Sequence, residues 1–505
     1  MTVRELLERL ARALPPDARP EFAALGRALD VPCLAVTHDS RRVKPGWAFV
    51  AVRGLKSDGT DFVPQAAAAG AAVIVAERPP TDPSTVPWVV VQDARLALAW
   101  MAAELAGHPS RSMRVVGVTG TNGKTTTSYL VNAIFEAAGV RCGLMGTVTY
   151  RLPGREFTAA RTTPEAPELQ DMLREMADGG CGACVMEVSS HALALRRADA
   201  VHFAAGVFTN LTRDHLDFHA DMEDYFAAKR RLFELLPRDA PAVVNIDDPR
   251  GSLLGDLAGR LVSYAVNRPA DVTPGPVAFS LDGLEFDVRT PGETIHIRST
   301  LVGRPNVYNI LAAAAVTTAL GVPAEAVTRG VSSLQGVPGR FEKVSSPADD
   351  ITVIVDYAHT DDALRNLLEM ARPLAARRLI TVFGAGGDRD RTKRPLMGMV
   401  AARLSDVVVI TSDNPRSEDP ERIIDEVHRG AQAEARQQGA DVVTMADRRH
   451  AILHGVRLAE AGDLVVVAGK GHEKYQEIAG ESFPFDDVAV AREALDERRR
   501  RVRVG

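Results

Sequence analysis

The sequence predicts an α/β protein of three domains, in which strands and helices alternate around mostly parallel sheets. The chain has 505 residues, and at roughly 150 residues per domain this length corresponds to three domains. Hydrophobic residues make up 46% of the chain and aromatic residues only 5%, so we expect cores of Ala, Val, Leu and Ile. Short apolar runs alternate with helical stretches, which is the pattern of a parallel sheet covered by helices.

A first domain is predicted over residues 1–108. Its N-terminal segment has leucine and charged residues at helical spacing, and it ends with a strand at 88–91 and an Ala/Leu-rich helix at 95–106. The N-terminus lacks the uncharged stretch and cleavage site of a signal peptide. The longest run of apolar residues and glycine covers only residues 66–76, whereas a bilayer requires about 20. We therefore expect a cytoplasmic protein without a membrane partner.

A central domain is predicted over residues 109–337. A strand at 114–119 leads through a glycine turn into a helix that begins at Lys124, which is typical of a parallel sheet of the P-loop type. Helical patterns stop between about residues 261 and 301, where alternating apolar and polar residues predict a small antiparallel appendage. The later strands of the parallel sheet are predicted at 184–188, 204–208 and 242–246.

A C-terminal domain is predicted over residues 338–505, with a second parallel sheet of the Rossmann-like type. Gly384 and Gly386 follow a strand like the first two glycines of a GxGxxG dinucleotide motif, but Arg389 occupies the third glycine position. A dinucleotide site and an oxidoreductase are therefore disfavoured. The basic run 498–501 is expected to be a solvated helix end. The strands are predicted at 351–355, 379–383, 407–411 and 464–468.

Charge and cysteine content argue against several classes of protein. Lys and Arg number 60 and Asp and Glu 66, which gives a formal charge of −6. A protein that wraps nucleic acid needs an excess of cations, so no nucleic-acid partner is expected. The four cysteines are too few to crosslink the chain. Cys181 and Cys184 form a CxxC without a second pair or a nearby histidine, which favours two small buried residues over a metal or redox site.

The strongest local motif lies between the strand at 114–119 and the following helix. Backbone N–H groups and the helix N-terminus can surround phosphate oxygens, Lys124 can reach the terminal phosphates, and the Thr125 hydroxyl can bind Mg²⁺. The alternative is a glycine turn with an incidental lysine, because Val118 stands where the usual motif has its first glycine. The flanking strand and helix favour phosphate binding. The residues concerned are Gly120, Thr121, Asn122, Gly123, Lys124, Thr125 and Thr126.

Beyond this loop, two polar residues are candidates for a metal site and a third residue carries no such signal of its own. Glu187 lies near the end of a predicted strand, where a metal-binding carboxylate would lie beside a phosphate loop, and a solvent-exposed glutamate is the alternative. His215 lies in a segment dense in His and Asp and could contribute to the same site, with a structural histidine as the alternative. On chemistry alone, Lys229 would be a surface lysine on a helix.

These segments together resemble the Mur ligase family, the ATP-dependent amide-forming enzymes of peptidoglycan synthesis. TGTNGKTTT at 119–127 is similar to the family's phosphate loop, including its departure from the general motif. Within the family, the resemblance is to the branch that makes the UDP-muramoyl tripeptide. Further family motifs follow in order along essentially the whole chain: DSR at 39–41, Gly54, Asp58 with Gly59, TTPE at 162–165, EVSSHAL at 187–193, TRDHLDFH at 212–219, NVYN at 306–309, DYAH at 356–359, GDRDRTKRPLM at 387–397, DNPR at 413–416 and GKGHE at 469–473.

The resemblance implies an acid–amino-acid ligase with ATP as co-substrate and Mg²⁺ as cofactor. A carboxylate of UDP-N-acetylmuramoyl-L-Ala-D-Glu would attack the γ-phosphate of ATP to give an acyl phosphate and ADP, and an amine would then displace phosphate. Catalytic roles are implied for Lys124, Glu187, His215 and Lys229. Magnesium would be held by Thr125, Glu187, His215 and, as a carbamate, Lys229. ATP would also contact Asn306, Asn309, Arg340 and Asp356.

For the sugar nucleotide, the resemblance implies contacts from two parts of the chain. Ser40 would contact the uridine, while Thr162, Thr163, Ser189 and Arg197 would contact the muramoyl peptide. The chain departs from some relatives at three positions: Arg161 stands in place of Asn, Leu195 in place of Gln and Pro305 in place of Phe.

The incoming amino acid is predicted to be meso-diaminopimelate. Asp413, Asn414, Pro415 and Arg416 follow a predicted strand, at the sheet edge where ligands bind; out of context, an ordinary Asn-Pro turn would be the alternative. Diaminopimelate is a lysine with one extra carboxylate, for which Arg416 offers a planar fork. The resemblance adds Arg389, Gly469 and Glu473 to this site.

Two alternatives to this function are open at this point. Within the class, the chain could be a lysine-adding ligase or another Mur-type ligase. Outside the ligase class, the chain could be a catalytically silent nucleotide-binding scaffold. The presence of the four predicted catalytic residues argues against this alternative: Lys124, Glu187, His215 and Lys229. A monomer is expected.

Overall fold

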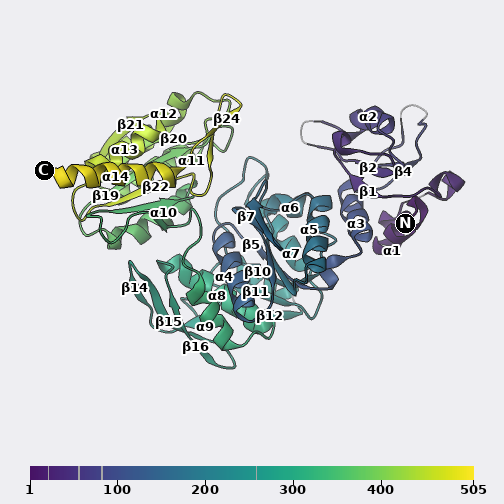
Figure 1. Ribbon diagram of the computed structural model, residues 1–505, viewed down its shortest axis with the longest axis horizontal. Coiled ribbons are helices and arrows are strands. Elements are labelled where there is room, and N and C mark those ends of the chain that lie inside the picture. Colours follow the sequence, from purple (N-terminus) through teal and green to yellow (C-terminus); the bar gives the residue numbers. More distant parts are fainter. Residues whose placement is uncertain (21, 55–56, 81–83, 258, 505) are drawn as a thin grey trace.

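The computed structural model describes residues 1–20, 22–54, 57–80, 84–257 and 259–504. Three units, each built on its own main sheet, follow one another along the chain, with the N-terminal and C-terminal units on opposite sides of the central one (Figure 1). Strands alternate with helices and most neighbouring strands are parallel. The predicted α/β class with three domains is therefore confirmed, whereas the boundaries after residues 108 and 337 stay predictions. Within the described residues, no helix is long and apolar enough to cross a membrane.

The N-terminal unit is a parallel sheet of four strands in the order β1-β2-β3-β4. Helix α1 begins with a capping box between Thr2 and Glu5 and buries Val3, Leu6 and Leu10 against this sheet's core. The strands are β1 (Ala35–Thr37), β2 (Trp47–Ala51), β3 (Val73–Ala76) and β4 (Trp88–Val90), and the helices are α1 (Val3–Ala13), α2 (Val63–Ala68) and α3 (Ala94–Ala106).

The central unit has a sheet of eight strands in the order β12-β11-β10-β5-β9-β6-β7-β8. The six strands from β12 to β6 are parallel, and β7 and β8 continue antiparallel at one edge. The strands are β5 (Arg114–Thr119), β6 (Cys142–Met145), β7 (Thr149–Leu152), β8 (Arg155–Thr158), β9 (Ala183–Glu187), β10 (Phe203–Phe208), β11 (Pro241–Asn245) and β12 (Arg260–Tyr264).

Two layers of helices cover this sheet. On one face, α4, α8 and α9 bury a core that includes Val116 and Val118 of β5. On the other face, α5 and α7 pack over Val115 of the same strand, because successive strand residues point to opposite faces. The helices are α4 (Lys124–Ala137), α5 (Ala166–Asp178), α6 (Ser190–Ala194), α7 (Met222–Glu234), α8 (Arg304–Ala319) and α9 (Ala324–Ser333).

A small antiparallel sheet follows, as predicted, but it begins later than expected. Residues 261–264 belong to β12, which pairs in parallel with β11 at the edge of the main sheet. The prediction that the appendage starts near residue 261 is therefore wrong. The appendage itself consists of β13 (Thr273–Pro274), β14 (Ala278–Ser280), β15 (Gly283–Arg289) and β16 (Thr294–Ser299).

The C-terminal unit has a six-stranded sheet in the order β17-β18-β22-β19-β20-β21, in which only β17 is antiparallel. Helices α10, α11 and α12 cover one face, and α13 and α14 cover the other. A two-stranded hairpin, β23 (Tyr475–Ile478) and β24 (Glu481–Pro484), follows β22. The remaining elements are β17 (Glu342–Lys343), β18 (Thr352–Asp356), α10 (Asp361–Ala371), β19 (Leu379–Ala385), α11 (Lys393–Leu404), β20 (Val407–Ser412), α12 (Pro420–Gln438), β21 (Asp441–Met445), α13 (Arg448–Leu458), β22 (Leu464–Ala468) and α14 (Asp487–Val504).

A buried ion pair joins the two helices on one face of this sheet. The Arg448 guanidinium donates to both carboxylate oxygens of Asp487, at 2.8 and 2.6 Å, and both side chains are fully buried. Arg448 also donates to the carbonyls of Ser412 and Ala468, where β20 and β22 end. One arginine thus ties α13 and α14 to two strand ends.

We expect Arg448→Met to lower the free energy of unfolding by about 3–5 kcal/mol, because it leaves the Asp487 carboxylate buried without a partner. The matched control is Arg449→Met, since Arg449 pairs with Glu493 in solvent and such pairs contribute at most about 1 kcal/mol. Urea unfolding measures both variants, and equal losses would contradict the assignment.

Candidate functional site: a nucleotide site between two units

The phosphate loop connects β5 to α4 at the carboxyl end of the central strand. Gly120 has φ 142°, and a Cβ there would overlap the Thr209 hydroxyl oxygen. Gly123 has φ 87°, and a Cβ there would overlap the Asn309 side-chain oxygen. Both positions therefore require glycine for the backbone conformation and for close packing. The loop amides and the N-terminus of α4 form an anion-binding geometry.

Two lysine ammonium groups meet at one carbonyl of this loop. Lys124 Nζ donates to the carbonyls of Gly120, at 2.9 Å, and Thr121, at 2.8 Å, while Lys229 Nζ donates to the carbonyl of Gly120 at 2.7 Å. Burial lowers the pKa of Lys124. Burial and the neighbouring Lys124 charge lower the pKa of Lys229 well below its usual range. Within the described residues neither lysine forms an ion pair with a carboxylate, so an anionic ligand fits here.

Lys229 lies in α7 and is only 1% exposed. Its ammonium nitrogen lies 4.3 Å from the centre of the Tyr225 ring, whose hydroxyl is 3.2 Å from the Thr121 hydroxyl. The interpretation of Lys229 as a surface lysine, which chemistry alone favoured, is therefore wrong. Helical spacing did not reveal this, because the side chain is buried by the loop of a distant strand.

Glu187 ends β9 beside the loop and is 1% exposed. Its carboxylate accepts hydrogen bonds from the backbone N–H of Thr147, at 2.8 Å, and from the Thr147 hydroxyl, at 2.9 Å. The alternative of a solvent-exposed glutamate is wrong. Thr147 was not predicted as a site residue, and it lies on the turn between β6 and β7.

His215 is held in a left-handed conformation with φ 55°. The Asp214 carboxylate accepts a hydrogen bond from the His215 backbone N–H at 2.8 Å and lies 3.5 Å from its Nε2. Its ring meets the His191 ring edge-on, with 4.8 Å between centroids. Burial lowers the pKa of His215 to about 3 and that of His191 to about 4. Both rings are therefore neutral near pH 7, which is the metal-ligating form of imidazole.

The predicted magnesium ligands agree with the chemistry of the site, though they do not form a closed cage. The described residues contain no cluster of three or more His, Cys, Asp or Glu that could hold a metal by itself. Magnesium usually keeps several waters and binds through one or two protein oxygens plus substrate phosphates. The Glu187 carboxylate and the Thr125 hydroxyl are hard oxygen donors of this kind. The donor set therefore fits magnesium held jointly with a phosphate.

The predicted adenosine contacts come from the central and C-terminal units and meet at the loop. Asn309 Nδ2 donates to Asn306 Oδ1 at 2.9 Å on α8, and Asn309 also lies within 3.4 Å of the Thr127 hydroxyl. Arg340 donates to the Thr125 hydroxyl at 3.2 Å and stacks on the Tyr357 ring. Pro305, one of the three departures, lies in the first turn of α8.

Asp356 anchors the connection that carries Arg340. Its carboxylate accepts from the backbone N–H groups of Phe341, at 2.6 Å, and Ala358, at 2.8 Å, and burial raises its pKa. A further link between the units was not predicted: Asn122 in the loop donates to Asp362 of α10 at 3.1 Å.

Four of the five predicted sugar-nucleotide contacts lie together beside Glu187. The Thr163 hydroxyl donates to the Glu187 carbonyl at 2.8 Å and accepts from the Ser189 backbone N–H at 3.1 Å. Arg197 donates to the Thr163 carbonyl at 3.3 Å. Thr162 lies 3.1 Å from the Thr147 hydroxyl, between hydroxyl oxygens. These contacts form one polar wall of the site.

Two of the departures from relatives lie close in sequence to these contacts: Arg161 directly precedes Thr162, and Leu195 precedes Arg197 by two residues. Glu165 forms a 2.7 Å ion pair with Arg197 and a longer one, at 3.8 Å, with Arg161. Glu165 belongs to the TTPE motif, so the motif could have identified it. Leu195 ends α6 as its C-cap residue.

The fifth predicted contact, Ser40, lies in the N-terminal unit. It is buried, and its hydroxyl donates to the Gln65 side chain at 2.8 Å. Within the described residues no hydrogen bond joins Ser40 to the other four.

The predicted amino-acid site gathers where β20 and β22 end. Asn414 Nδ2 donates to Glu473 Oε2 at 2.9 Å. Arg416 has φ 53°, donates to the Gly387 carbonyl at 2.7 Å and lies 3.3 Å from a Glu477 carboxylate oxygen. Gly469 has φ 119°, and a Cβ there would overlap a buried carboxylate oxygen of Asp413.

Pro415 and Arg389 are two other predicted residues of this site, and their contacts are with Gly387 and Asp217. The Pro415 carbonyl packs against Gly387, where a Cβ would overlap it. Arg389 is half-exposed and reaches across to Asp217 of the central unit at 3.8 Å. Lys470 and Glu477 contact the site but were not predicted; Lys470 belongs to the GKGHE motif, which could have identified it.

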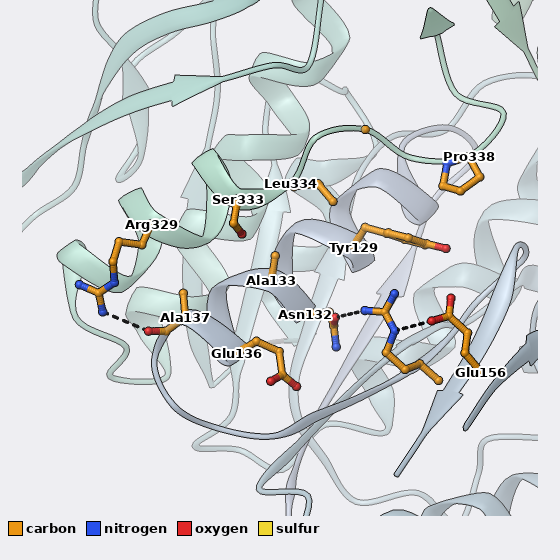
Figure 2. A pocket seen from close by; sticks show the side chains of 12 residues that line it. Tyr129, Asn132, Ala133, Glu136, Ala137, Glu156, Arg329, Ser333, Leu334 and Pro338 are labelled. Carbon is orange, nitrogen blue, oxygen red and sulfur yellow. Dashed lines mark hydrogen bonds and ion pairs between the residues drawn. The ribbon is translucent and has the colours of Figure 1, made fainter. Parts of the chain in front are cut away.

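A separate hollow of about 600 Å³ lies along the outer side of α4, between α9, the β7–β8 hairpin and Pro338 (Figure 2). The arginines at its edge already have hydrogen-bond partners. Arg151 donates to the Asn132 and Glu156 side chains, and Arg329 donates to the Ala137 carbonyl. None of the predicted site residues lines it. The hollow is therefore distinct from the nucleotide site.

Three sequence models of one family match successive parts of the chain. They are the Mur ligase family catalytic domain at residues 34–105, the Mur ligase middle domain at 118–317 and the Mur ligase glutamate ligase domain at 339–471. The chain belongs to the Mur ligase family. The matches confirm the family resemblance on which the site assignment rests.

Relatives of this Mur ligase cover nearly its whole length. A UDP-N-acetylmuramoyl-L-alanyl-D-glutamate–2,6-diaminopimelate ligase of Gloeobacter violaceus is 47% identical over 94% of the chain and 96% of the relative. One of the same name from Geobacter metallireducens is 45% identical, over 95% of the chain and 96% of the relative. A solved structure with that name has a TM-score of 0.68 at 33% identity, covering 99% of both chains. MurF from Thermotoga maritima in complex with ADP, at 20% identity and a TM-score of 0.63 over 92% of this chain and 98% of that one, shares the fold.

We expect Gly123→Ala to weaken ATP binding at least tenfold, because the added Cβ overlaps Asn309 and the φ of 87° disfavours alanine. The matched control is Gly139→Ala just beyond the other end of α4, where φ is 76° and no atom lies within 4 Å of the added Cβ. Calorimetric titration with ATP compares the two variants. The same loss of affinity in both would contradict the role of the loop.

Proposed function

We propose that this chain is an ATP-dependent ligase that joins meso-2,6-diaminopimelate to UDP-N-acetylmuramoyl-L-Ala-D-Glu in peptidoglycan biosynthesis. The relatives that cover almost its full length carry this activity in their names, at 42–47% identity. The single observation that carries the proposal is that an arginine fork and a carboxylate follow the two parallel strands on either side of β19: Arg416 follows β20 and Glu473 follows β22.

The charges of this site match diaminopimelate better than lysine. Arg416 has planar N–H donors for the distal carboxylate, while Glu473 can accept from an ammonium group. Asp413 has a buried carboxylate oxygen for which no hydrogen-bond partner is recorded among the described residues. Lysine has no distal carboxylate, so bound lysine would leave Arg416 without the substrate's anion. The unmet donors of Arg416 would lower the affinity for lysine relative to diaminopimelate.

In the first step, a substrate carboxylate attacks the γ-phosphate of ATP, and the acyl phosphate and ADP form. Lys124 exchanges its carbonyl partners in the loop for phosphate oxygens and stabilises the transferring phosphoryl group. Asn306, Asn309, Arg340 and Asp356 orient the nucleotide. Magnesium, when bound, neutralises phosphate charge, and Thr125, Glu187, His215 and a carbamylated Lys229 would hold it.

In the second step, the amine of the incoming amino acid attacks the acyl carbonyl and phosphate leaves. The amino-acid site lies in the C-terminal unit, so this step requires that unit to contact the central one. Arg213 donates to Asp390 at 2.8 Å and Asn122 donates to Asp362 at 3.1 Å across the two units. These contacts join the units in the described arrangement, and closure on ATP would exclude water from the acyl phosphate.

The remaining assignments follow the division of the chain. Residues 1–108 bind the uridine through Ser40, and residues 338–505 bind diaminopimelate. Residues 109–337 bind ATP, magnesium and the muramoyl peptide, the last through Thr162, Thr163, Ser189 and Arg197. We further propose that the enzyme acts as a monomer in the cytoplasm, where ATP and nucleotide-linked sugars are available.

The surroundings of Lys229 support the proposed carbamylation. Only a neutral amine reacts with CO₂, and burial beside Lys124 lowers the pKa of Lys229. The reaction exchanges a cation next to a magnesium site for an anion, which removes the repulsion between the two lysines.

We expect Lys229→Ala to abolish turnover without rescue by bicarbonate, because alanine cannot carry a carbamate. The control is Arg230→Ala, since Arg230 is half-exposed and pairs with Glu234 in solvent. Intact-mass measurement should find the wild-type chain heavier by one CO₂. Full activity of Lys229→Ala would contradict the assignment, and an unmodified but active wild-type chain would exclude the carbamate.

The ligase function is tested with ATP, Mg²⁺ and UDP-N-acetylmuramoyl-L-Ala-D-Glu, supplied with either meso-diaminopimelate or L-lysine. We expect a product only with diaminopimelate, identified by its mass. We also expect Arg416→Ala to raise KM for diaminopimelate about ten- to hundredfold, since a charge-assisted bond contributes about 1.5–3 kcal/mol.

Arg422→Ala is the control for Arg416, because Arg422 lies in the first turn of α12 and is mostly exposed. A product with lysine alone would indicate a lysine-adding ligase. No product with either amino acid would favour the silent scaffold, and an unchanged KM in Arg416→Ala would exclude the proposed role of that residue.

A further inference from the structure

We propose that Lys470 is a positioning residue for the incoming amino acid, and that it sets the orientation in which Asn414 and Glu473 meet the substrate. The inference rests on the proposed function, because it concerns the site assigned to diaminopimelate. Lys470 lies in the connection between β22 and the β23–β24 hairpin, and its side chain is fully buried.

Both side-chain bonds of the Lys470 ammonium lead to predicted substrate contacts. Its Nζ donates to Asn414 Oδ1 at 2.9 Å and to Glu473 Oε2 at 3.1 Å. Asn414 Nδ2 donates to the same Glu473 oxygen at 2.9 Å. The three side chains therefore form a closed triangle of hydrogen bonds, with the Tyr475 ring centre 5.4 Å from the ammonium.

Lys470 determines which way the Asn414 amide faces. The amide oxygen accepts from Lys470 and from the backbone N–H of Glu477, at 3.0 Å. A flipped amide would direct its NH₂ group at these two donors and leave them unsatisfied. The amide nitrogen is thereby fixed toward Glu473.

The same arrangement selects one oxygen of Glu473 for the substrate. Its Oε2 already accepts from Asn414 and Lys470, whereas no hydrogen bond to Oε1 is recorded within the described part of the chain. Oε1 is therefore the oxygen available to a substrate ammonium group. Without Lys470, the carboxylate could rotate and the direction of this acceptor would no longer be fixed.

Replacement of Lys470 by methionine distinguishes a positioning role from simple packing. A buried ammonium is costly to desolvate unless its partners compensate, and a methionine would fill a similar volume without that cost. A lysine that only packs would leave substrate affinity unchanged when replaced by methionine. A lysine that positions Asn414 and Glu473 would change the affinity for the amino acid alone.

The test is steady-state kinetics of the full-length chain with Lys470→Met, varying each of the three substrates in turn. We expect KM for meso-diaminopimelate to rise about ten- to hundredfold, as for the loss of charge-assisted bonds. KM for ATP and for the UDP-linked substrate should stay within about twofold. Lys474→Met is the control, because Lys474 lies in the same connection but is exposed and pairs with Asp486.

Asn414→Leu provides a second measurement on the same triangle, and the double variant should lose little more than either single one, because the residues act as a unit. If Lys470→Met does not fold, Lys470→Gln retains a shorter, neutral donor, and the same rise in KM is expected of it. An unchanged KM for diaminopimelate, or an equal rise for ATP, would overturn the inference. Failure of the wild-type chain to use diaminopimelate would overturn the proposed function instead.

Discussion

The nucleotide site depends on one carbonyl oxygen, that of Gly120, which accepts hydrogen bonds from the ammonium groups of both Lys124 and Lys229. Burial lowers the pKa of both lysines, and the Lys124 charge lowers the pKa of Lys229 further. Within the described residues, neither ammonium group forms an ion pair with a carboxylate. A phosphate that approaches the loop therefore gains attraction without any rearrangement of the backbone, which is electrostatic preorganisation for an anionic ligand.

The same loop also links the central and C-terminal units. Thr125 accepts a hydrogen bond from Arg340, and Asn122 donates one to Asp362, so both loop residues have partners beyond the central sheet. A nucleotide that contacts Thr125 and Arg340 together binds best when the units are in contact. Under the proposed function, we therefore expect nucleotide binding and contact between the two units to be thermodynamically linked, because each favours the same arrangement.

The sequence predicted the fold best where a strand is central and bounded by clear signals. The bounds of β5 and β22 agree to the residue, since each is an apolar run followed by glycine, and α4 begins at Lys124 as predicted. Strands β1 to β3 were not predicted. In the case of β3, the apolar run 66–76 covers both the end of α2 and the strand, and an unbroken apolar run does not separate a strand from a helix by periodicity. Strand β12 was misassigned because it lies at a sheet edge, where two of its five residues are exposed and two are half-buried, so it lacks the continuous apolar run of a central parallel strand.

The site was predictable wherever a motif carries the chemistry, whereas Thr147 and Asp362 support it from outside those motifs; Lys470 lies within the GKGHE motif but was not predicted. Thr147, Asp362 and Lys470 act on Glu187, Asn122 and Asn414, from which they are 40, 240 and 56 residues distant. Other contacts explain how a chain of net charge −6 keeps cations available for anionic substrates. Lys124 bonds to carbonyls, Arg197 to Glu165, and Arg416 to Glu477 and the Gly387 carbonyl. Under the proposed function, each partner compensates a partly or fully buried cation until a substrate phosphate or carboxylate replaces or joins that partner. The site would then select anions by exchange of partners rather than by holding unpaired charges.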